Sequence, residues 1–455
     1  MIFQSLGGAK LIGANSHFLN IDDIGILLDT GLDPRVDGQG SLPGHDSLIG
    51  RMIDALFVSH CHLDHLGALP PTIKRFPHAR VFMSYVSSFL YTTMLHNTVN
   101  VMEHLRLEKF IDEYPLYSHE DVDLISFIVQ GMKFYKTFRV FGHHNPDRGI
   151  ECAWYPAGHT LGAGGLYIKA KEGRVFYTGD TCSRDQFLIK GADYPDDPVD
   201  ILITENTLGH EEQGFKRRSE VQRLTRILNE TFESKGSVLI PAFALGKTQE
   251  ILWLINDLKK KKTIPDVSVF VSGLGRAVAR IYDLTVEHAN RLHENFFFDE
   301  TEFTVLDSRD LMREGPWLKR PSVILASSGM MLENTPSYFL ACRMMREARH
   351  TICFAGYVSP DSPAHVVKHS VQGGETILPG LDDRLHRQCR IEQVHFTGHS
   401  TRHDILGMIK QLSPKKIVLV HNGSEEAAWW MKSQISEWDP AIEVIVPEIG
   451  VSYDL

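Results

Sequence analysis

A run of seven residues, Ser59-His60-Cys61-His62-Leu63-Asp64-His65, places four potential metal ligands in one short segment. Imidazole and carboxylate groups are the ligands that zinc and similar ions select. The run directly follows the apolar stretch Ala55-Leu56-Phe57-Val58, which predicts a buried strand with the run at its end. Because burying this many unpaired histidine and aspartate side chains would be costly, the run predicts a metal site and not a packing feature.

Other predicted strands also end in residues that could do chemistry. The apolar stretches that begin at residues 24, 154, 174, 200 and 416 lead into Asp29, His159, Asp180, Glu205 and His421. Open sheets place their sites at strand ends, because the loops at one edge can converge while the sheet stays packed. We therefore expect these side chains to meet the histidine-rich run.

Two metal sites can be assembled from these residues. One ion would take His60, His62 and His159, and a second would take Asp64, His65 and His421, with Asp180 bridging both. Side chains alternate in an extended segment, so His60 and His62 project to one side, and a following turn can present Asp64 and His65 to a neighbouring ion. Two ions about 3.5–4 Å apart can activate a water and stabilise charge at a phosphorus or carbonyl centre.

Composition sets limits on the class of protein. The chain has 455 residues, enough for two domains or one elaborated domain, and its content of 43% hydrophobic and 23% charged residues is ordinary for a globular protein. Six scattered cysteines without a CxxC pair indicate reduced thiols in a cytosol, and neither a signal peptide nor a membrane span is predicted, so we expect a cytoplasmic protein. A net charge of −10 gives no global attraction to nucleic acid, so such a partner would need a local basic surface or a metal site.

The chain is predicted to contain an inserted domain. Strands and helices alternate between Gly209 and about Gln388, which indicates βαβ units on a parallel sheet. The expected organisation is a first domain over residues 1–208, the insert over 209–388 and a return to the first domain over 389–455. Helices are also expected over 84–102 and over 121–129, the latter with Ser118 and Asp121 as a capping pair and Gly131 as a stop.

Together these motifs resemble a known family. The pattern His60-x-His62-x-Asp64-His65, with His159 and Asp180 downstream, resembles the metallo-β-lactamase fold, an α/β sandwich with metals at one edge. Three further segments resemble the motifs of the β-CASP nucleases, and they begin at Thr204, Val394 and Val418. The chain resembles prokaryotic relatives of the pre-mRNA 3′-end-processing endonuclease and, more distantly, ribonuclease J.

The resemblance implies an αββα sandwich with an inserted β-CASP domain on a mostly parallel sheet, and a two-metal ribonuclease, acting as an endonuclease, a 5′-exonuclease or both. A hydroxide bridging two ions, Zn²⁺ or alternatively Mn²⁺, would attack the phosphodiester and leave 5′-phosphate and 3′-hydroxyl ends. His399, paired with Glu205, would act as general acid, and Asp29 would orient the ligand histidines. The implied catalytic set is His399, Glu205, Asp180 and Asp29. The implied metal ligands are His60, His62, Asp64, His65, His159, Asp180 and His421.

The resemblance also concerns substrate and partners. Single-stranded RNA is the expected substrate, with Ser327, Ser328, Gly329 and Ser400 as its binding residues, and a homodimer is left open. A thioester or lactone hydrolase, a DNA nuclease and a non-catalytic processing-complex subunit remain alternatives. The large insert argues against a small substrate, and the filled ligand positions argue against loss of catalysis.

Two features depart from the family pattern. Asn422 and Gly423 follow His421 where relatives commonly have Gly-Glu, which changes the loop beside a predicted ligand. The chain ends at Leu455, soon after the third motif, so we expect neither the additional C-terminal domain of ribonuclease J nor an N-terminal RNA-binding module.

Overall fold

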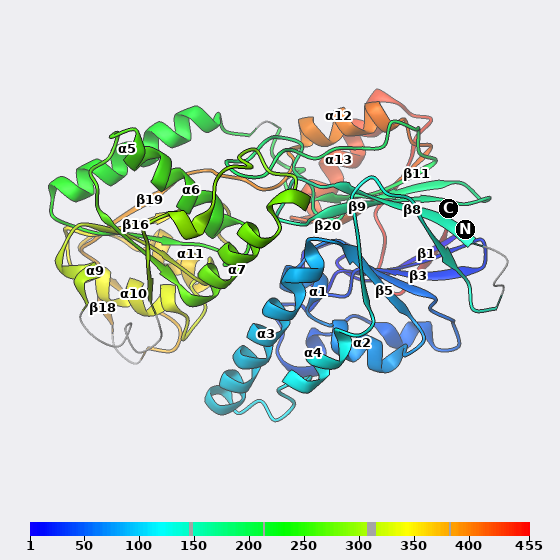
Figure 1. Cartoon of the computed structure of the whole chain (residues 1–455), viewed down its shortest axis with the longest axis horizontal. Coiled ribbons are helices and arrows are strands. Elements are labelled where there is room, and N and C mark those ends of the chain that lie inside the picture. Colours follow the sequence, from blue (N-terminus) through cyan, green and yellow to red (C-terminus); the bar gives the residue numbers. More distant parts are fainter. Residues whose placement is uncertain (145–148, 213, 307–314, 382–383) are drawn as a thin grey trace. The chain divides into compact units, whose positions relative to one another are not determined.

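The structure, a computed structural model, describes residues 1–455 except 145–148, 213, 307–314 and 382–383, and it divides into two compact units (Figure 1). The first unit comprises Met1–Gln213, Glu287–Arg291 and Gly398–Leu455, and the second comprises Gly214–Val286 and Leu292–Thr397. The chain therefore passes between the units four times. The expected domain boundaries at residues 208 and 388 stay a prediction.

The first unit contains two seven-stranded sheets. The first sheet has the order β22 (Ser452–Asp454), β1 (Ile2–Gly7), β2 (Ser16–Ile21), β3 (Ile24–Leu28), β4 (Ala55–Val58), β5 (Arg80–Ser84), β6 (Val129–Met132). The second sheet has the order β21 (Glu443–Ile445), β20 (Lys416–Asn422), β11 (Ile201–Asn206), β10 (Arg174–Tyr177), β9 (Gly164–Lys169), β8 (Gly149–Pro156), β7 (Phe138–Phe141).

Parallel pairing brings the polar strand ends together. Strands β3, β4, β5 and β6 are parallel neighbours in the first sheet, and β10, β11, β20 and β21 are parallel neighbours in the second. The carboxyl ends of neighbouring parallel strands lie at the same edge of a sheet, so the residues that follow β3 and β4 are placed near one another, and so are those that follow β10 and β11.

A hydrophobic core fills the space between the two sheets. It includes Phe57 of β4, Trp154 of β8, Tyr177 of β10 and Ile203 of β11, each no more than 2% exposed. Each large apolar side chain buried in this way contributes about 1.5–3 kcal/mol of transfer free energy. The core therefore fixes the strands whose ends carry the polar residues.

Helices cover the outer faces of the sandwich (Figure 1). Helices α12 (Arg402–Leu412) and α13 (Glu425–Trp438) pack on the second sheet, where Ile405, Met431 and Ile435 join a separate apolar cluster with Leu202. The remaining helices of the first unit are α1 (Leu63–Leu66), α2 (Leu69–Arg75), α3 (Ser87–Lys109) and α4 (His119–Ile125). The arrangement is the αββα sandwich that the sequence predicts.

The helix predictions hold in part. The capping pair is present, because Ser118 and Asp121 exchange hydrogen bonds at the start of α4. Gly131 is not the helix stop, because α4 ends at Ile125 and Gly131 lies inside β6. The helix expected over 84–102 begins later and extends further, since Ser84 is the last residue of β5 and α3 ends at Lys109, followed by Phe110 in a left-handed conformation.

The second unit is built on a parallel sheet, as predicted. Its six strands have the order β14 (Thr304–Leu306), β13 (Ser268–Ser272), β15 (Ser322–Ala326), β12 (Val238–Pro241), β16 (Thr351–Phe354), β19 (Arg390–Gln393), and every pairing is parallel. A two-stranded ribbon consists of β17 (Glu375–Thr376) and β18 (Leu385–His386). The helices are α5 (Arg217–Glu233), α6 (Lys247–Lys260), α7 (Gly273–Leu284), α9 (Pro316–Lys319), α10 (Pro336–Met344) and α11 (Pro363–His369).

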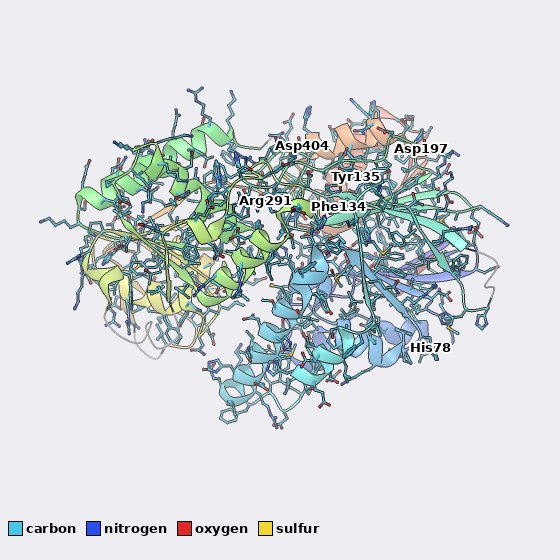
Figure 2. The ribbon with its side chains drawn as sticks, viewed as in Figure 1. His78, Phe134, Tyr135, Asp197, Arg291 and Asp404 are labelled. Carbon is cyan, nitrogen blue, oxygen red and sulfur yellow. The ribbon has the colours of Figure 1, made fainter. Side chains whose placement is uncertain are left out.

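The short segment Glu287–Arg291 returns to the first unit from within the second. Arg291, labelled in Figure 2, is only 1% exposed and forms an antiparallel bridge with Ile189. The backbone N–H of Lys190 donates to the carbonyl of Asn290, and the His288 ring meets the Tyr85 ring edge-on at 4.8 Å. Five residues from the middle of the insert are therefore an integral part of the first unit.

Across the part of the chain that the structure describes, no helix has the length and apolar character needed to cross a membrane.

Candidate metal centre and acid–histidine pair

The side chains predicted to bind metal converge within the first unit. His60 and His62 follow β4, Asp64 and His65 lie in α1, and His159 follows β8. Asp180 follows β10, and His421 lies near the end of β20 with a positive φ of 49°. Five segments from distant parts of the chain thus contribute to one site, and four of them lie at strand ends, as predicted.

Three histidines and one carboxylate form the first cluster. His62 Nδ1 lies 3.1 Å from both His60 Nε2 and His159 Nε2. The Oδ2 atom of Asp180 lies 3.7 Å from His60 Nε2 and 3.6 Å from His159 Nε2. The sequence assigns the three histidines to one ion and Asp180 to the bridge between the two ions, and these four side chains lie together in the structure.

Asp64, His65 and His421 form the second cluster. Asp64 Oδ2 lies 3.3 Å from His421 Nε2 and 3.8 Å from His65 Nε2. The other oxygen of Asp180, Oδ1, lies 3.2 Å from His65 Nε2 and 3.4 Å from His421 Nδ1. Asp180 therefore directs one carboxylate oxygen toward each cluster, as a bridging ligand must.

The donor atoms fit metal ions better than they fit one another. Ligands about 2.0–2.1 Å from a tetrahedral zinc ion lie roughly 3.3 Å apart, which is close to the separations within the first cluster. His62 Nδ1 is equally close to two other ring nitrogens, and one proton cannot serve both contacts. Asp180 Oδ1 is buried and has no hydrogen-bond partner among the described residues. Cations held between these groups would satisfy all of them.

The surroundings of the ligand atoms keep them in the protonation states that bind a metal ion. Desolvation lowers the pKa of His60 and that of His159 well below the usual range of histidine, so both rings keep the lone pairs that a metal needs. Desolvation would raise the pKa of Asp180, but the charges of His421 and His65 outweigh it and hold that pKa well below its usual range. The carboxylate is therefore ionised and available as a ligand.

Asp29 fixes the orientation of one ligand histidine. Its carboxylate accepts hydrogen bonds from His65 Nδ1 at 2.8 Å, Tyr177 Oη at 2.5 Å, and the Ser59 amide and hydroxyl at 2.6 and 2.7 Å. A ring that donates from Nδ1 presents the lone pair of Nε2, which faces the metal cluster. Burial, followed by the charge of Asp29, raises the pKa of Tyr177 well above its usual range, so its hydroxyl remains a donor.

Two other ligand histidines are oriented by groups that the sequence did not indicate. His159 Nδ1 donates to the carbonyl of Gly398 at 2.8 Å, which leaves Nε2 for the metal. The amide of Gln186 donates to the His159 carbonyl at 2.6 Å and steadies the loop. His421 Nδ1 lies 2.9 Å from the hydroxyl of Thr207. Single polar residues of this kind carry no recognisable spacing, so only the fold reveals their positions.

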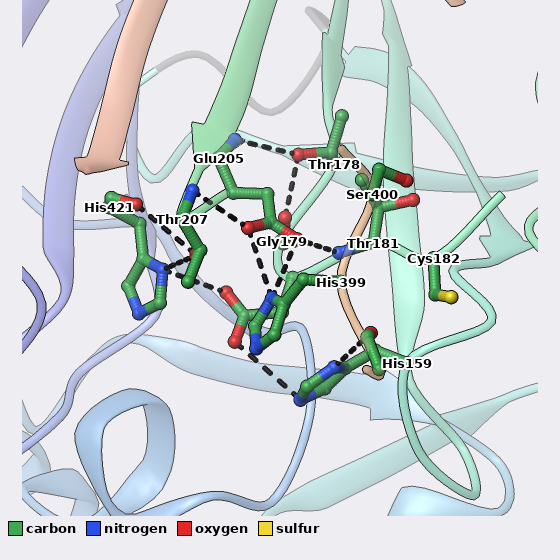
Figure 3. A network of polar contacts seen from close by, with 12 residues as sticks. His159, Thr178, Gly179, Thr181, Cys182, Glu205, Thr207, His399, Ser400 and His421 are labelled. Atoms are coloured by element: carbon green, nitrogen blue, oxygen red, sulfur yellow. Dashed lines mark hydrogen bonds and ion pairs between the residues drawn. The ribbon is translucent and has the colours of Figure 1, made fainter. Parts of the chain in front are cut away.

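Glu205 and His399 form a pair beside both clusters (Figure 3). His399 Nδ1 lies 3.0 Å from Glu205 Oε1 and 3.1 Å from Oε2. The backbone amides of Thr181 and Thr207 donate to the same two oxygens, at 2.6 and 3.2 Å, and hold the carboxylate in place. The carboxylate is 1% exposed, whereas the His399 side chain is 22% exposed and its ring centre lies 4.5 Å from that of His159.

The four predicted substrate-binding residues have different surroundings. Ser400 is buried in the first unit, where its hydroxyl accepts a hydrogen bond from the Ser183 amide at 2.9 Å. Ser327, Ser328 and Gly329 belong to the second unit and follow β15. Their role in binding substrate stays a prediction.

Asn422, which follows the predicted ligand His421, is fully buried. Its amide nitrogen donates to the carbonyl of Ala9 at 2.8 Å, and its Oδ1 accepts from the Asn206 side chain at 2.7 Å. Asn206 follows Glu205 at the end of β11. This buried amide pair joins the strand that carries Glu205 to the strand that carries His421.

Comparisons with known families assign the class of protein. The metallo-beta-lactamase superfamily domain matches residues 18–208, the Beta-Casp domain matches residues 248–367, and the Zn-dependent metallo-hydrolase RNA specificity domain matches residues 384–447. The chain belongs to the metallo-β-lactamase superfamily and carries a β-CASP domain. The matched domains describe a zinc-dependent metallo-hydrolase with an RNA specificity domain. The histidine and aspartate clusters agree with that description.

Individual relatives are distant. The chain is 28% identical over 435 residues to endoribonuclease YSH1 of Candida glabrata, covering 92% of this chain and 54% of that protein. It is 26% identical over 434 residues to cleavage and polyadenylation specificity factor 73 of Drosophila melanogaster, covering 93% of this chain and 60% of that protein. The chain thus spans about half the length of the curated relatives it matches.

A solved structure shares the fold. The crystal structure of a protein of unknown function from Enterococcus faecalis V583 matches with a TM-score of 0.56 at 13% identity, covering 100% of this chain and 99% of that one.

Proposed function

We propose that this protein is a ribonuclease that hydrolyses RNA phosphodiester bonds with two metal ions, most simply Zn²⁺, and leaves 5′-phosphate and 3′-hydroxyl ends. The observation that carries the proposal is the Glu205–His399 pair, which lies beside both metal clusters. A hydrolase that only activated water would not need a second, partly exposed histidine held by a buried carboxylate. The endoribonuclease names of the curated relatives and the RNA specificity domain support RNA as the substrate.

Each part of the site has a role in this reaction. His60, His62 and His159 would hold one ion, Asp64, His65 and His421 would hold the other, and Asp180 would bridge them. Ions at these positions would lower the pKa of bound water and stabilise negative charge on the phosphoryl oxygens. The seven ligands offer nitrogen and carboxylate oxygen atoms, a donor set that suits zinc.

His399 would supply the proton for the leaving group. Its Nδ1–H donates to Glu205, so in the protonated ring Nε2 carries the second proton and is free of that contact. Water would release one proton to solvent and add its hydroxyl to phosphorus, the bond from phosphorus to the 3′ oxygen would break, and that oxygen would take the His399 proton. A proton from solvent would then restore His399. The products are one 5′-phosphate and one 3′-hydroxyl. Asp29 would contribute only indirectly, through its hydrogen bond to His65.

The test compares His399→Ala with the wild-type protein on RNA labelled at the 5′ or the 3′ end and on single-stranded DNA of the same sequence. Loss of a general acid costs about 10²–10⁴-fold in rate, while metal content measured by mass spectrometry should stay unchanged. His403→Ala is the matched control, because His403 is an exposed histidine on α12 near the same site. Undiminished RNA cleavage by His399→Ala would remove His399 from the mechanism, and exclusive cleavage of DNA would refute the RNA assignment.

A further inference from the structure

Three aromatic side chains of the second unit are unusually exposed. Among its described residues, the aromatic side chains more than a third exposed are Phe215 at 53%, Phe243 at 43% and Tyr357 at 57%. The other exposed large apolar residues of this unit are aliphatic. Single exposed apolar side chains need no explanation, but a shared location does.

All three aromatic rings lie at one edge of the parallel sheet. Phe243 follows β12 by two residues, and Tyr357 follows β16 by three. Phe215 precedes α5, but its ring stacks on that of His395, which follows β19, with ring centres 3.8 Å apart and an interplanar angle of 14°. Since β12, β16 and β19 are adjacent parallel strands, their carboxyl ends form a single edge. We call Phe215, Phe243 and Tyr357 the aromatic edge.

The backbone that carries the aromatic edge is held by hydrogen bonds between neighbouring loops. The Gln393 side chain donates to the carbonyl of Gly356, which precedes Tyr357, at 2.8 Å. The Lys247 ammonium donates to the carbonyl of Phe396, next to His395. The Ala242 amide, next to Phe243, donates to the Ala326 carbonyl at 3.0 Å. The rings therefore project from a fixed framework, which reduces the entropy lost when a ligand binds.

Groups beside the aromatic edge favour a polyanionic strand. Gly329 packs closely against Phe243, since a Cβ built on Gly329 would be 3.2 Å from Phe243 Cδ2. Strand β13, two strands away from β12 in the same sheet, leads into helix α7, which has no acidic residue in its first turn and carries the exposed Arg276 and Arg280. These cations suit phosphates, while the rings suit planar bases.

From this arrangement we infer that the aromatic edge binds single-stranded nucleic acid by stacking bases on Phe243, Tyr357 and Phe215. Every base has an aromatic face, so stacking of this kind tolerates any sequence, and each stacked base contributes about 1–3 kcal/mol. Adjacent strands are about 4.8 Å apart, so β12 and β19 are separated by roughly 10 Å, which accommodates two or three nucleotides. The inference rests on the proposed RNA substrate and extends it to how the strand is recognised.

The test is equilibrium binding of fluorescein-labelled ten-nucleotide oligoadenylate RNA, followed by fluorescence anisotropy in EDTA so that no cleavage occurs. Phe243→Leu and Tyr357→Leu should each raise Kd by about 5- to 150-fold, because they remove the ring but keep apolar bulk. Phe243→Tyr and Tyr357→Phe keep the ring and should bind like the wild-type protein. Duplex RNA of the same length should show no difference between leucine and aromatic variants, because its bases are not accessible.

The salt dependence of Kd separates stacking from a general loss of structure. The leucine variants remove no charge, so the slope of log Kd against log salt should equal that of the wild-type protein, whereas Arg276→Gln should reduce it by about 0.7. Leucine variants that bind oligoadenylate as tightly as the wild-type protein would overturn the inference, as would a wild-type protein that does not bind it. Binding without any cleavage after metal is restored would refute the proposed ribonuclease activity alone.

Discussion

Asp29→Asn replaces the carboxylate that orients His65 by an amide of the same shape. Four donor groups converge on the two oxygens of Asp29, and three of them, His65 Nδ1, Tyr177 Oη and Ser59 Oγ, reach the same oxygen. In asparagine one of the two positions becomes an NH₂ group, which cannot accept any of these hydrogen bonds. If the NH₂ group faces His65, the ring must present Nδ1 as an acceptor, and its proton moves to Nε2, the atom that faces the second metal cluster.

The expected losses of metal affinity and of stability follow from the hydrogen bonds that Asp29→Asn removes. Removing the group that orients a ligand histidine typically lowers metal affinity by about 10- to 100-fold, equivalent to about 1.4–2.8 kcal/mol. Each buried donor left without a partner costs a further 1–3 kcal/mol or so in the stability of the metal-free protein. Both effects are expected because Asp29 is fully buried and water cannot replace it.

The assay is competition for zinc with a fluorescent chelator, together with urea denaturation in EDTA. Asp54→Asn is the matched control, because Asp54 is also buried and accepts hydrogen bonds from the Gly25 amide and His143, but it lies outside the metal clusters. Both variants should lose stability, and only Asp29→Asn should lose zinc affinity. Equal zinc affinity in Asp29→Asn and the wild-type protein, or an equal loss in Asp54→Asn, would refute the reasoning.

Two further outcomes are expected. Asp180→Ala should bind fewer than two equivalents of zinc by mass spectrometry, because it removes the carboxylate that faces both clusters, and two full equivalents would contradict the bridging assignment. Burial, with a smaller contribution from Arg75, lowers the pKa of His45 to about 4. Between pH 6.5 and 4 the unfolded chain therefore binds the proton more readily, so His45 makes the protein lose stability as the pH falls. His45→Gln should reduce the loss between pH 7 and pH 5 by up to roughly 2 kcal/mol in urea titrations with EDTA, and an unchanged difference would show that His45 titrates normally.

The sequence is most informative where a single structural requirement determines the spacing of several residues. His60, His62, Asp64 and His65 are recognisable because metal ligation requires all of them in one segment, and the alternation of strands and helices after Gly209 reflects a parallel sheet. By contrast, Tyr177, Thr207 and Gln186 each support one ligand histidine or its loop from a distant part of the chain. A single side chain has no pattern, so its partner is evident only once the strands are assembled.

Helix boundaries illustrate the same limit on a smaller scale. Ser118 and Asp121 form a reciprocal cap, which is a local interaction between residues three apart, and the sequence predicts it correctly. Gly131 looks like a helix stop, but its strand pairs with β5, so tertiary contacts decide its conformation.

The return of Glu287–Arg291 to the first unit bears on how this protein can be divided. A shortened gene that joins residue 213 directly to residue 398 would delete the second unit and, with it, the partner of Ile189 and the ring that meets Tyr85. The buried Arg291 would vanish from the interior of the remaining unit. The β-CASP domain is therefore not an interchangeable module of this chain, and exchanging it between homologues would require the donor's equivalent of these five residues to match the recipient's sandwich.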